Sequence, residues 1–486
     1  MREGAARSVA ETHLSIVVFL GEHAYKFRKH VRFPFADLST AGARERDCYR
    51  EVELNRRLAP DVYLGVAQLR LAGDDVAAGG PVEHAVVMRR LPEECRLATI
   101  VAAGATTSAA GDAIDAVAER LAAFHATAER SPSITEDASP TAVAAALDDN
   151  VTEMAPLIDR HGDPGVFARV VELARRFVAG RSPLFALRCR NGDICDGHGD
   201  LQADDVYCCP DGVRILDCLQ IDDRLRHVDI ASDVAFLAMD VEVRGEPAAA
   251  ELFVERYEAH AGQELPPALL DYYIATRALV RAKVGCIRHD QGGDTATGVA
   301  RYLELARRHL ERSRVRLVVV GGLPGSGKST LAHMIAERIG ARVLRTDELR
   351  RVLPSPPGPG ERYRPDAVRA VYESMFAAAR SGLEMGTSVV VDATFAAEER
   401  RAHAVEVARA CHAEVALVHC VVDDDVAERR LAARSRHGTS LSEADVEVRR
   451  SMASGEAPWP AGCDVDTGES PEVSLERALE VLERRS

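Results

Sequence analysis

Residues 322–329 read GLPGSGKS and combine glycine, lysine and serine at spacings that suit the binding of phosphate groups. The segment fits the P-loop (Walker A) pattern G-x-x-x-x-G-K-[ST] and lies between an apolar run typical of a strand and a run typical of a helix. Its glycines let backbone N–H groups approach phosphate oxygens, and the start of a helix adds a favourable dipole. We therefore expect a nucleotide site formed by Gly322, Leu323, Pro324, Gly325, Ser326, Gly327, Lys328, Ser329 and Thr330.

Several charged residues around and after this loop could act on a bound nucleotide. In this pattern the lysine, Lys328, reaches the β- and γ-phosphates, and the hydroxyl of Ser329 binds Mg²⁺. Asp347 follows the next predicted strand, where ligands bind in an open parallel sheet, and Arg350 follows one helical turn later. Asp347 could take a proton from an acceptor hydroxyl while Arg350 holds an acceptor group. Asp392 ends the strand SVVVDAT and could hold Mg²⁺ through water.

A helix rich in arginine follows further along the chain. The segment RRLAARSR places Arg430 and Arg434 four residues apart, with Arg436 beyond them. Arginines on a helix that closes over transferring phosphates stabilise the developing negative charge only when the site is shut. A solvated basic helix face is the alternative explanation of the same spacing.

A second set of candidate residues lies earlier, in the segment HGDLQADD at 198–205. In kinase loops of the form H-x-D-x-x-x-x-N, the aspartate takes the proton of the acceptor hydroxyl and the asparagine binds Mg²⁺. Asp200 has the position of the proton acceptor, and Asp205 replaces the asparagine. A carboxylate also binds Mg²⁺, so we expect Asp205 to remain a metal ligand, together with Asp217 of the segment VRILDCL.

Lys26 and Glu51 are candidates for holding nucleotide phosphates in this earlier part of the chain. HAYKF puts Lys26 on a predicted strand, Glu51 lies on the next helix, and HAVVMRRL could contact the adenine. The chain has only four lysines, at 26, 29, 283 and 328, and two of them fall in phosphate-binding patterns. The first strands carry no G-x-G-x-x-G loop, so phosphates must be held here in another way or not at all.

The segment DDRLRHVDIASD, residues 222–233, is acidic and follows the second metal-ligand candidate. Asp222, Asp223 and Asp229 could bind a cationic aminoglycoside or amino sugar, or they could cap helices and face solvent. Lys283 lies on a helical face that could reach the same place, or it is a surface cation.

The helices and strands expected to position these residues are arranged differently before and after residue 312. Before residue 312 we expect a strand hairpin at 15–21 and 23–29, a strand at 84–91, a loop at 131–142, and helices at 44–59, 114–128, 143–180 and 230–312. After residue 315, strands at 341–346, 387–394 and 414–422 alternate with helices, which predicts a doubly wound parallel sheet.

Composition excludes several classes of function. The net charge of −15 argues against a general nucleic-acid binder, because phosphate backbones attract basic surfaces. No run of eighteen apolar residues and no apolar N-terminal signal is visible, so we expect a cytoplasmic protein. The eleven cysteines lack a CxxC or ligand spacing, which indicates reduced thiols. The sequence leaves the oligomeric state open.

The two sets of motifs resemble two kinase families. Residues 1–311 resemble the aminoglycoside phosphotransferase-like kinases, through HAYKF, HGDL and LDCL. Residues 312–486 resemble P-loop kinases of the polynucleotide kinase, gluconate kinase and zeta-toxin type, through GLPGSGKS and RTDELRR. The order of all these motifs is similar to that of the bifunctional aminoglycoside phosphotransferase/ATP-binding proteins. The resemblance implies an α+β kinase-like domain before an α/β P-loop domain, ATP and Mg²⁺ as cofactors, and Asp347 as general base.

Three functions are compatible with these patterns. The first is a phosphotransferase with two kinase modules that act on hydroxyl acceptors, such as a sugar, an aminoglycoside, a nucleoside or a polynucleotide 5′-hydroxyl. In the second, only the P-loop domain catalyses and the preceding domain binds or regulates, which the missing glycine loop keeps open. The third is a non-enzymatic nucleotide sensor, against which Asp347 and the arginine helix speak, since a sensor needs no base.

Overall fold

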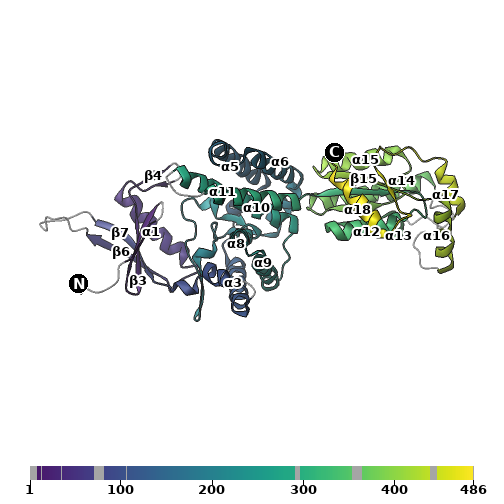
Figure 1. Ribbon diagram of the computed structural model, residues 1–486. Coiled ribbons are helices and arrows are strands. Elements are labelled where there is room, and N and C mark those ends of the chain that lie inside the picture. The colour runs from purple at the N-terminus through teal and green to yellow at the C-terminus, as the bar shows by residue number, and fades with distance from the viewer. Residues whose placement is uncertain are drawn as a thin grey trace. The chain divides into compact units, whose positions relative to one another are not determined.

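The computed structural model describes residues 8–11, 14–33, 36–70, 82–104, 107–290, 296–352, 364–437 and 446–484 (Figure 1). The chain divides into two compact units. The first unit comprises residues 1–167, 188–266 and 273–309, and the second comprises 168–187, 267–272 and 310–486. Because both units are discontinuous along the chain, the single boundary expected at residue 312 stays a prediction.

The first unit begins with a five-stranded antiparallel sheet of order β1-β2-β3-β7-β6. Its strands are β1 (Ser8–Glu11), β2 (Ser15–Leu20), β3 (His23–Arg28), β6 (Tyr63–Arg70) and β7 (Val82–Arg89). The predicted hairpin is confirmed, and Gly21 turns it with a φ of 59°. Helix α1 (Ala41–Asn55) lies on this sheet and buries Cys48 and Val52 against Ala24 and Val86 (Figure 1). Between β3 and α1 lies a small pair, β4 (Arg32–Phe33) and β5 (Ala36–Asp37).

Helices make up most of the remaining first unit. They are η1 (Glu93–Cys95), α2 (Leu97–Ala102), α3 (Ser108–Thr127), α4 (Pro132–Asp137), α5 (Pro140–His161), η2 (Ala203–Asp205), η3 (Asp223–Leu225), α8 (Ile230–Val243) and α9 (Pro247–Ala261). Helices α6 (Pro164–Gly180), α10 (Pro267–Asp290) and α11 (Ala296–Arg312) contribute to both units, and α7 (Ser182–Asn191) spans the join at residues 187 and 188.

The loop expected at 131–142 is wrong, because α4 and the start of α5 occupy it. Ser131 and Ser139 accept hydrogen bonds from the backbone N–H groups of Ile134 and Ala142, at 3.2 and 3.4 Å. A proline follows each serine at the first helical position, where its missing N–H costs nothing. The serines and prolines that suggested a loop are therefore the start signals of two helices.

Two short antiparallel strand pairs carry the segment around residues 198–217. One pairs β8 (Ile194–Asp196) with β11 (His227–Asp229), and the other pairs β9 (Val206–Cys209) with β10 (Gly212–Ile215). Within the segment VRILDCL, strand β10 ends at Ile215, and Asp217 follows with a left-handed φ of 62°. A non-glycine residue in this conformation is uncommon, so the surrounding contacts must hold Asp217 in place.

The second unit contains a five-stranded parallel sheet of order β13-β14-β12-β15-β16, as the alternating pattern predicted. The strands are β12 (Arg316–Gly321), β13 (Arg342–Arg345), β14 (Val389–Asp392), β15 (Glu414–Val421) and β16 (Asp464–Asp466). The helices are α12 (Lys328–Ile339), α13 (Thr346–Val352), α14 (Pro365–Glu384), α15 (Glu398–Ala410), α16 (Asp424–His437), α17 (Val446–Ala453) and α18 (Pro471–Glu483).

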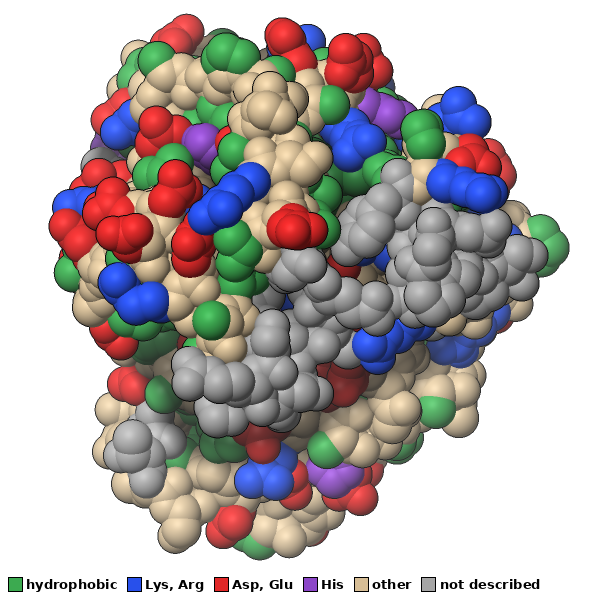
Figure 2. Space-filling view, turned by 90° about the vertical axis from the view of Figure 1, so that its right-hand side faces the viewer, with side chains coloured by type: hydrophobic (Ala, Val, Ile, Leu, Met, Phe, Trp, Pro, Cys, Tyr) green, Lys and Arg blue, Asp and Glu red, His purple; other side chains and the backbone are tan. Residues whose placement is uncertain are grey.

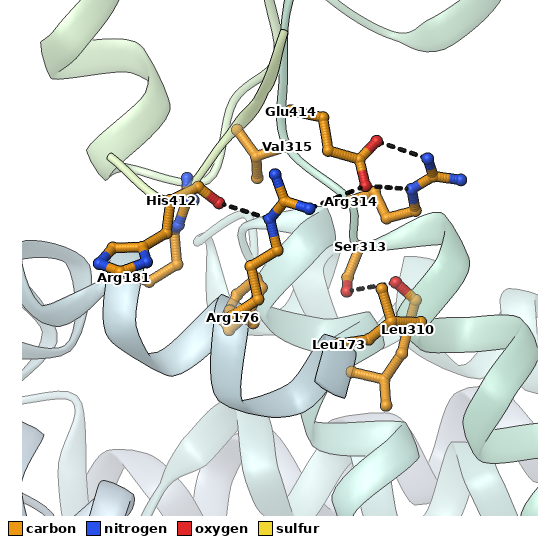
Figure 3. A pocket seen from close by; sticks show the side chains of 10 residues that line it. Leu173, Arg176, Arg181, Leu310, Ser313, Arg314, Val315, His412 and Glu414 are labelled. Atoms are coloured by element: carbon orange, nitrogen blue, oxygen red, sulfur yellow. Dashed lines mark hydrogen bonds and ion pairs between the residues drawn. The ribbon is translucent and has the colours of Figure 1, made fainter. Parts of the chain in front are cut away.

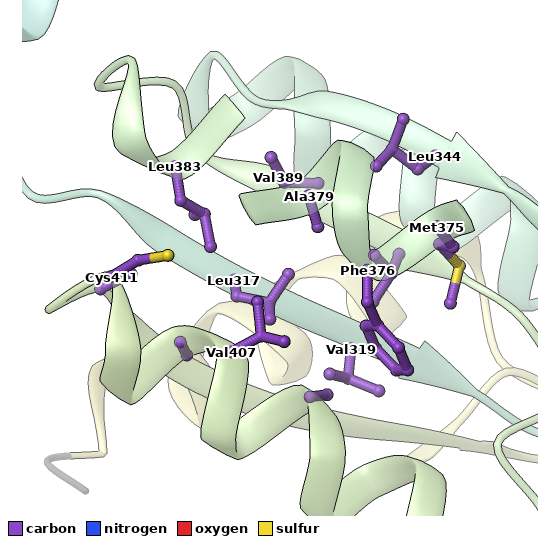
Figure 4. Close-up of a cluster of buried hydrophobic side chains, with 14 of the residues drawn as sticks. Leu317, Val319, Leu344, Met375, Phe376, Ala379, Leu383, Val389, Val407 and Cys411 are labelled. Atoms are coloured by element: carbon purple, nitrogen blue, oxygen red, sulfur yellow. The ribbon is translucent and has the colours of Figure 1, made fainter. Parts of the chain in front are cut away.

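Strand β12 is buried on both of its faces. Leu317 and Val319 belong to the cluster drawn in Figure 4, together with apolar residues of α14 and α15. Val318 and Val320 belong to a second cluster, with apolar residues of α12 and α18. Since successive side chains of a strand point to opposite faces, helices on both sides require a continuous apolar run. The sequence LVVVG meets that requirement.

The surface and the cysteines agree with the composition. Figure 2 shows one face on which acidic and basic side chains are mixed, with acidic side chains gathered at its upper left. No described helix combines the length and the apolar character needed to cross a bilayer. All eleven cysteines are free thiols.

Arg181 joins two helix ends of the second unit to the segment before α7, and Figure 3 shows the pocket that it lines together with Arg176 and His412. Its guanidinium donates to the carbonyl oxygen of Leu383 in α14 and, at 2.8 Å, to that of Cys411 after α15. The side chain is 1% exposed, and burial lowers the pKa of Arg181 to about 10. Carbonyls at helix C-termini carry partial negative charge, so they stabilise a buried cation. Arg176 donates to the carbonyl of His412 beside it (3.0 Å).

We predict that Arg181→Met lowers the free energy of unfolding of the second unit by about 2–4 kcal/mol, because the buried carbonyls of Leu383 and Cys411 each lose a hydrogen bond from the charged guanidinium. Urea unfolding followed by the fluorescence of Trp459, the single tryptophan of the chain, measures this unit. Arg409→Met, on the exposed side of α15, is the control, with an expected change within about 0.5 kcal/mol. Equal curves for both variants would contradict the role of Arg181.

Candidate functional site

The glycine-rich segment connects β12 to α12, and its glycines adopt conformations that other residues avoid. The φ angles of Gly322, Gly325 and Gly327 are 140°, 83° and 81°. A Cβ atom at Gly322 would lie 2.5 Å from the carbonyl oxygen of Cys420, which no real side chain tolerates. Gly327 caps α12 without a side-chain hydrogen bond, so the first N–H groups of this helix face no capping side chain. This geometry suits an anion at the start of α12.

Three side chains from later in the chain hold the loop. Thr467 donates its hydroxyl to the carbonyl oxygen of Ser326 (2.6 Å), and Arg449 donates to that of Pro324 (2.7 Å). Arg430 of α16 donates to the carbonyl of Thr467 (2.7 Å). Motif analysis identified Arg430 but missed Thr467 and Arg449, because their contacts join segments more than a hundred residues apart. The hydroxyl of Ser326 is buried with no hydrogen-bond partner among the described residues.

Lys328 differs from the other three lysines in its surroundings. Lys26 pairs with Glu51, and the remaining two, at 29 and 283, pair with Glu11 and Glu153. Lys328 forms no ion pair with any residue that the structure describes. A cation without an acidic partner at the start of a helix favours an anionic ligand, and the residues present therefore fit a nucleotide triphosphate.

The expected magnesium ligands Ser329 and Asp392 share a partner, Arg345. Its guanidinium lies 3.1 Å from the carboxylate of Asp392 and donates to the hydroxyl of Ser329 at 3.4 Å. Asp392 is 4% exposed and pairs with Val320 in the register of the sheet, at the carboxyl end of β14. A carboxylate and a hydroxyl so close together fit Mg²⁺, which prefers oxygen ligands. Arg345 was missed by motif analysis, although it directly precedes the segment TDELRR.

Asp347 and Arg350 form an ion pair of 2.6 Å within α13. Asp347 lies in the first turn of α13, directly after the carboxyl end of β13, as expected. Arg350 therefore holds the carboxylate of Asp347 at this edge of the sheet. Arg430 lies beside the loop, since a Cβ at Gly327 would be 3.3 Å from its guanidinium. The side chains of Arg434 and Arg436 lie outside the described residues, so closure of the arginine helix stays a prediction.

In the first unit, Lys26 contacts two of the expected nucleotide-site residues. Its ammonium group lies 2.8 Å from Glu51 and 2.5 Å from Asp217. Burial disfavours the charged form, but Asp217 and Glu51 raise the pKa of Lys26 above its ordinary value. Lys26 in turn lowers the pKa of Asp217. Arg28, which motif analysis missed, also pairs with the fully buried Glu51 and donates to Ser15 (2.5 Å).

The catalytic-type loop is anchored by Asp233 of α8, another residue that motif analysis missed. Its carboxylate accepts the backbone N–H groups of His198 (2.6 Å) and Gly199 (2.9 Å) and lies 3.4 Å from His125. These contacts fix the backbone before Asp200, whose carboxylate remains one-third exposed. Burial of the carboxyl group raises the pKa of Asp200 above its ordinary value. Asp200 is therefore held where an acceptor can reach it.

Asp205, Asp217 and Asp200 concentrate negative charge in one place. Burial and the carboxylates of Asp217 and Asp200 raise the pKa of Asp205 well above its ordinary value. Repulsion of this kind is relieved by a divalent cation, so Asp205 and Asp217 fit Mg²⁺. No three His, Cys, Asp or Glu side chains converge as metal ligands in the described part of the chain. A metal here would be bound by these two carboxylates and completed by phosphates and water.

The connection between the first two strands is short. Strands β1 and β2 pair from Ser8 with Phe19 to Glu11 with Ile16, so only residues 12–14 connect them. Three residues give no room for a G-x-G-x-x-G segment, and phosphates in this unit have no clamp of that kind at this hairpin.

The acidic segment at 222–233 provides no free carboxylate for a cationic ligand among the three aspartates named from the sequence. Asp222 pairs with Arg224, Asp223 with Arg226 and Arg50, and Asp229 with Arg188. Asp222 and Asp229 also accept N–H groups at the starts of η3 and α8. Capping is confirmed for Asp222 and Asp229, although Asp229 is buried and does not face solvent, and Lys283 forms an exposed pair with Glu153.

Comparison with known proteins agrees with both units. Residues 317–458 match the family model described as an AAA domain. Uncharacterized protein Rv2004c of Mycobacterium tuberculosis (strain ATCC 25618 / H37Rv) is 39% identical over 482 residues, which cover 97% of this chain and 95% of the relative. Uncharacterized protein Mb2027c of Mycobacterium bovis matches to the same extent.

Solved structures of kinases also match parts of the chain. A choline/ethanolamine kinase family protein from Mesorhizobium loti is 15% identical and covers 62% of this chain and 92% of its own, with a TM-score of 0.37. A gluconokinase from Sinorhizobium meliloti is 21% identical and covers 36% of this chain and 94% of its own, with a TM-score of 0.25. Neither value carries an argument about function. By topology and motifs, the first unit has an aminoglycoside phosphotransferase-like kinase fold and the second a P-loop kinase fold.

We predict that Asp205→Asn stabilises the metal-free protein increasingly as the pH rises. A carboxyl group whose pKa is raised by folding binds its proton more tightly in the folded chain than in the unfolded chain. Its contribution to the free energy of unfolding is therefore fully present at low pH and is lost as the pH rises through the folded pKa. Asparagine, neutral at every pH, avoids this loss. In EDTA, circular dichroism should show a melting temperature above wild type by roughly 1–3 °C at about pH 8 and a smaller difference at about pH 5.

The exposed neighbour Asp204 provides the matched control, as Asp204→Asn. Its melting temperature should not show this growth with pH. A difference between Asp205→Asn and wild type that is the same at both pH values would contradict the proposed repulsion among the three carboxylates.

Proposed function

The chain belongs to the same family as the mycobacterial protein Rv2004c, and we propose that it is an ATP- and Mg²⁺-dependent phosphotransferase. One observation carries the proposal for the second unit. The glycine-rich loop, Asp392 and the Asp347–Arg350 pair all follow the carboxyl ends of neighbouring parallel strands. A phosphate-binding site and a proton acceptor therefore share one edge of the sheet, where ligands of such sheets bind.

The residues at this edge supply the parts of a phosphoryl transfer. The loop and Lys328 hold the triphosphate, while Ser329 and Asp392 hold Mg²⁺, which neutralises phosphate charge. The oxygen of the acceptor hydroxyl attacks the γ-phosphorus, the bond to the β-phosphate oxygen breaks, and the hydroxyl proton passes to Asp347. Arg350 orients the acceptor, and Arg430 stabilises negative charge beside the loop.

We propose a second phosphotransferase site in the first unit. The Lys26–Glu51 pair, the metal-ligand candidates Asp205 and Asp217, and the anchored Asp200 support it. The alternative, a module that only binds or regulates, is favoured by the three-residue connection between β1 and β2, which leaves no glycine-rich clamp. The acceptor of either unit is proposed to be a small-molecule or nucleotide-type hydroxyl compound.

Surface charge and free thiols bear on the kind of acceptor and on the location of the protein. The mixed charges on the face shown in Figure 2 support a small acceptor over extended nucleic-acid binding. Eleven free thiols support a cytoplasmic location, because disulfides persist mainly in oxidising compartments.

To find which unit turns over ATP, the rate of turnover is measured for four full-length proteins. These are wild type, Lys328→Ala, Asp200→Asn and the double variant. We expect Lys328→Ala to remove most turnover, because the loop lysine contacts the transferring phosphate. A residual rate that the double variant abolishes would establish catalysis by the first unit. Turnover of half or more in Lys328→Ala would place the main site outside the P-loop. If Asp200→Asn changes nothing in either background, the first unit is not a kinase.

We predict that Asp347→Asn lowers phosphoryl transfer by a factor on the order of 10²–10⁴, the usual contribution of a positioned base, and leaves nucleotide affinity nearly unchanged. Transfer is measured in a screen of sugars, nucleosides and 5′-hydroxyl oligonucleotides, and affinity by calorimetry. Asp366→Asn, exposed in the first turn of α14, is the control. Lost nucleotide binding with normal transfer per bound ATP would show that Asp347 has a different role.

A further inference from the structure

Two arginines of α10 face the proton acceptor of the first unit. A guanidinium nitrogen of Arg281 lies 4.0 Å from the carboxylate of Asp200, too far for a hydrogen bond but close enough for strong attraction. Arg277 precedes it by four residues, so both side chains lie on one face of the helix. The Nε atom of Arg281 is buried and has no hydrogen-bond partner among the described residues. Its donor capacity is therefore not used up by the protein.

The guanidinium group of Arg277 has no hydrogen-bonded carboxylate partner among the described residues. It donates to the hydroxyl of Ser232 (3.1 Å) and lies 5.0 Å above the ring of Phe236, which are both neutral groups. Asp233 lies on the same side, but His198, Gly199 and His125 already occupy its carboxylate. Burial lowers the pKa of Arg277 from its ordinary value, and the carboxylates of Asp233 and Asp200 oppose that effect from beyond hydrogen-bond distance. A bound anion would supply the directly bonded partner that these carboxylates do not provide.

The arginines of α10 and the nucleotide residues lie beside different carboxylates. Lys26 lies beside Asp217, and Asp217 and Asp200 are the carboxylates that act most strongly on Asp205. Arg281 is instead the cation that acts most strongly on Asp200. Arg281 therefore lies beside Asp200, the proposed proton acceptor, while Lys26 lies beside Asp217, a proposed metal ligand. A guanidinium so close to the proton acceptor is within reach of a charged group on the acceptor molecule.

We propose that the hydroxyl acceptor of the first unit is itself an anion, carrying a phosphate or carboxylate group that Arg281 and Arg277 bind. This inference rests on the proposed kinase function of the first unit. Guanidinium groups suit such a ligand because their fork of N–H donors matches phosphate and carboxylate oxygens. A cationic acceptor such as an amino sugar is disfavoured, because the aspartates at 222, 223 and 229 are all paired with arginine.

Inorganic phosphate is a suitable probe, used on the full-length Lys328→Ala chain saturated with Mg²⁺ and a non-hydrolysable ATP analogue. We expect calorimetry to show phosphate binding that weakens roughly tenfold when Arg281→Gln is added. Lys283→Gln, on the same helix and paired only with Glu153, is the matched control and should change nothing. Arg281→Lys retains the positive charge and should recover part of the affinity, which separates recognition of an anion from damage to the fold.

The outcomes are distinct. Phosphate binding that does not depend on Arg281 overturns the proposal. Phosphate that binds only without the ATP analogue also overturns it, because Arg281 would then serve the γ-phosphate position. If the analogue fails to bind the first unit while phosphate still binds through Arg281, the proposed kinase function fails and the anion site remains.

Discussion

The close packing around Gly322 constrains the candidate site of the second unit. A side chain there would collide with the carbonyl of Cys420 in the neighbouring strand β15, so only glycine lets the loop turn from β12 into α12. The start of α12 lies in place for an anion because that turn is possible. Thr467 and Arg449 then fix the loop by its carbonyls. Every charged residue of the proposed reaction is positioned with respect to this turn.

The first unit depends on a balance of buried charges instead. Glu51 is fully buried and acceptable there because Lys26 and Arg28 both pair with it. Lys26 extends this network to Asp217, whose left-handed backbone places its carboxylate near Asp205. Asp217 and Asp205 add negative charge to this network, and α10 brings the guanidinium of Arg281 to 4.0 Å from Asp200.

Motif spacing named most of the residues that the structure brings together at the two candidate sites, because the motifs consist of residues close in the sequence. Asp347 and Arg350 are three residues apart on one helix, and the loop is continuous. The residues that motif analysis missed, such as Arg345, Asp233 and Arg281, reach the sites from other elements. Nothing in their local sequence distinguishes them from ordinary surface or core charges. The error at 131–142 has a different cause, because serine at the cap and proline at the first position are local signals that also start helices.

By itself the sequence determined the kinase-like fold class of each unit, the hairpin that carries Lys26, the alternation of strands and helices after residue 315 and the phosphate-loop motif. Period, glycine spacing and apolar runs suffice for these features, because they reflect local geometry. Only the tertiary structure decided which charges are compensated. It paired the aspartates of 222–229 with arginines, left Lys328 without an acidic partner among the described residues, and directed Arg281 towards Asp200. Compensation of charge depends on distance through space, which spacing along the chain does not encode.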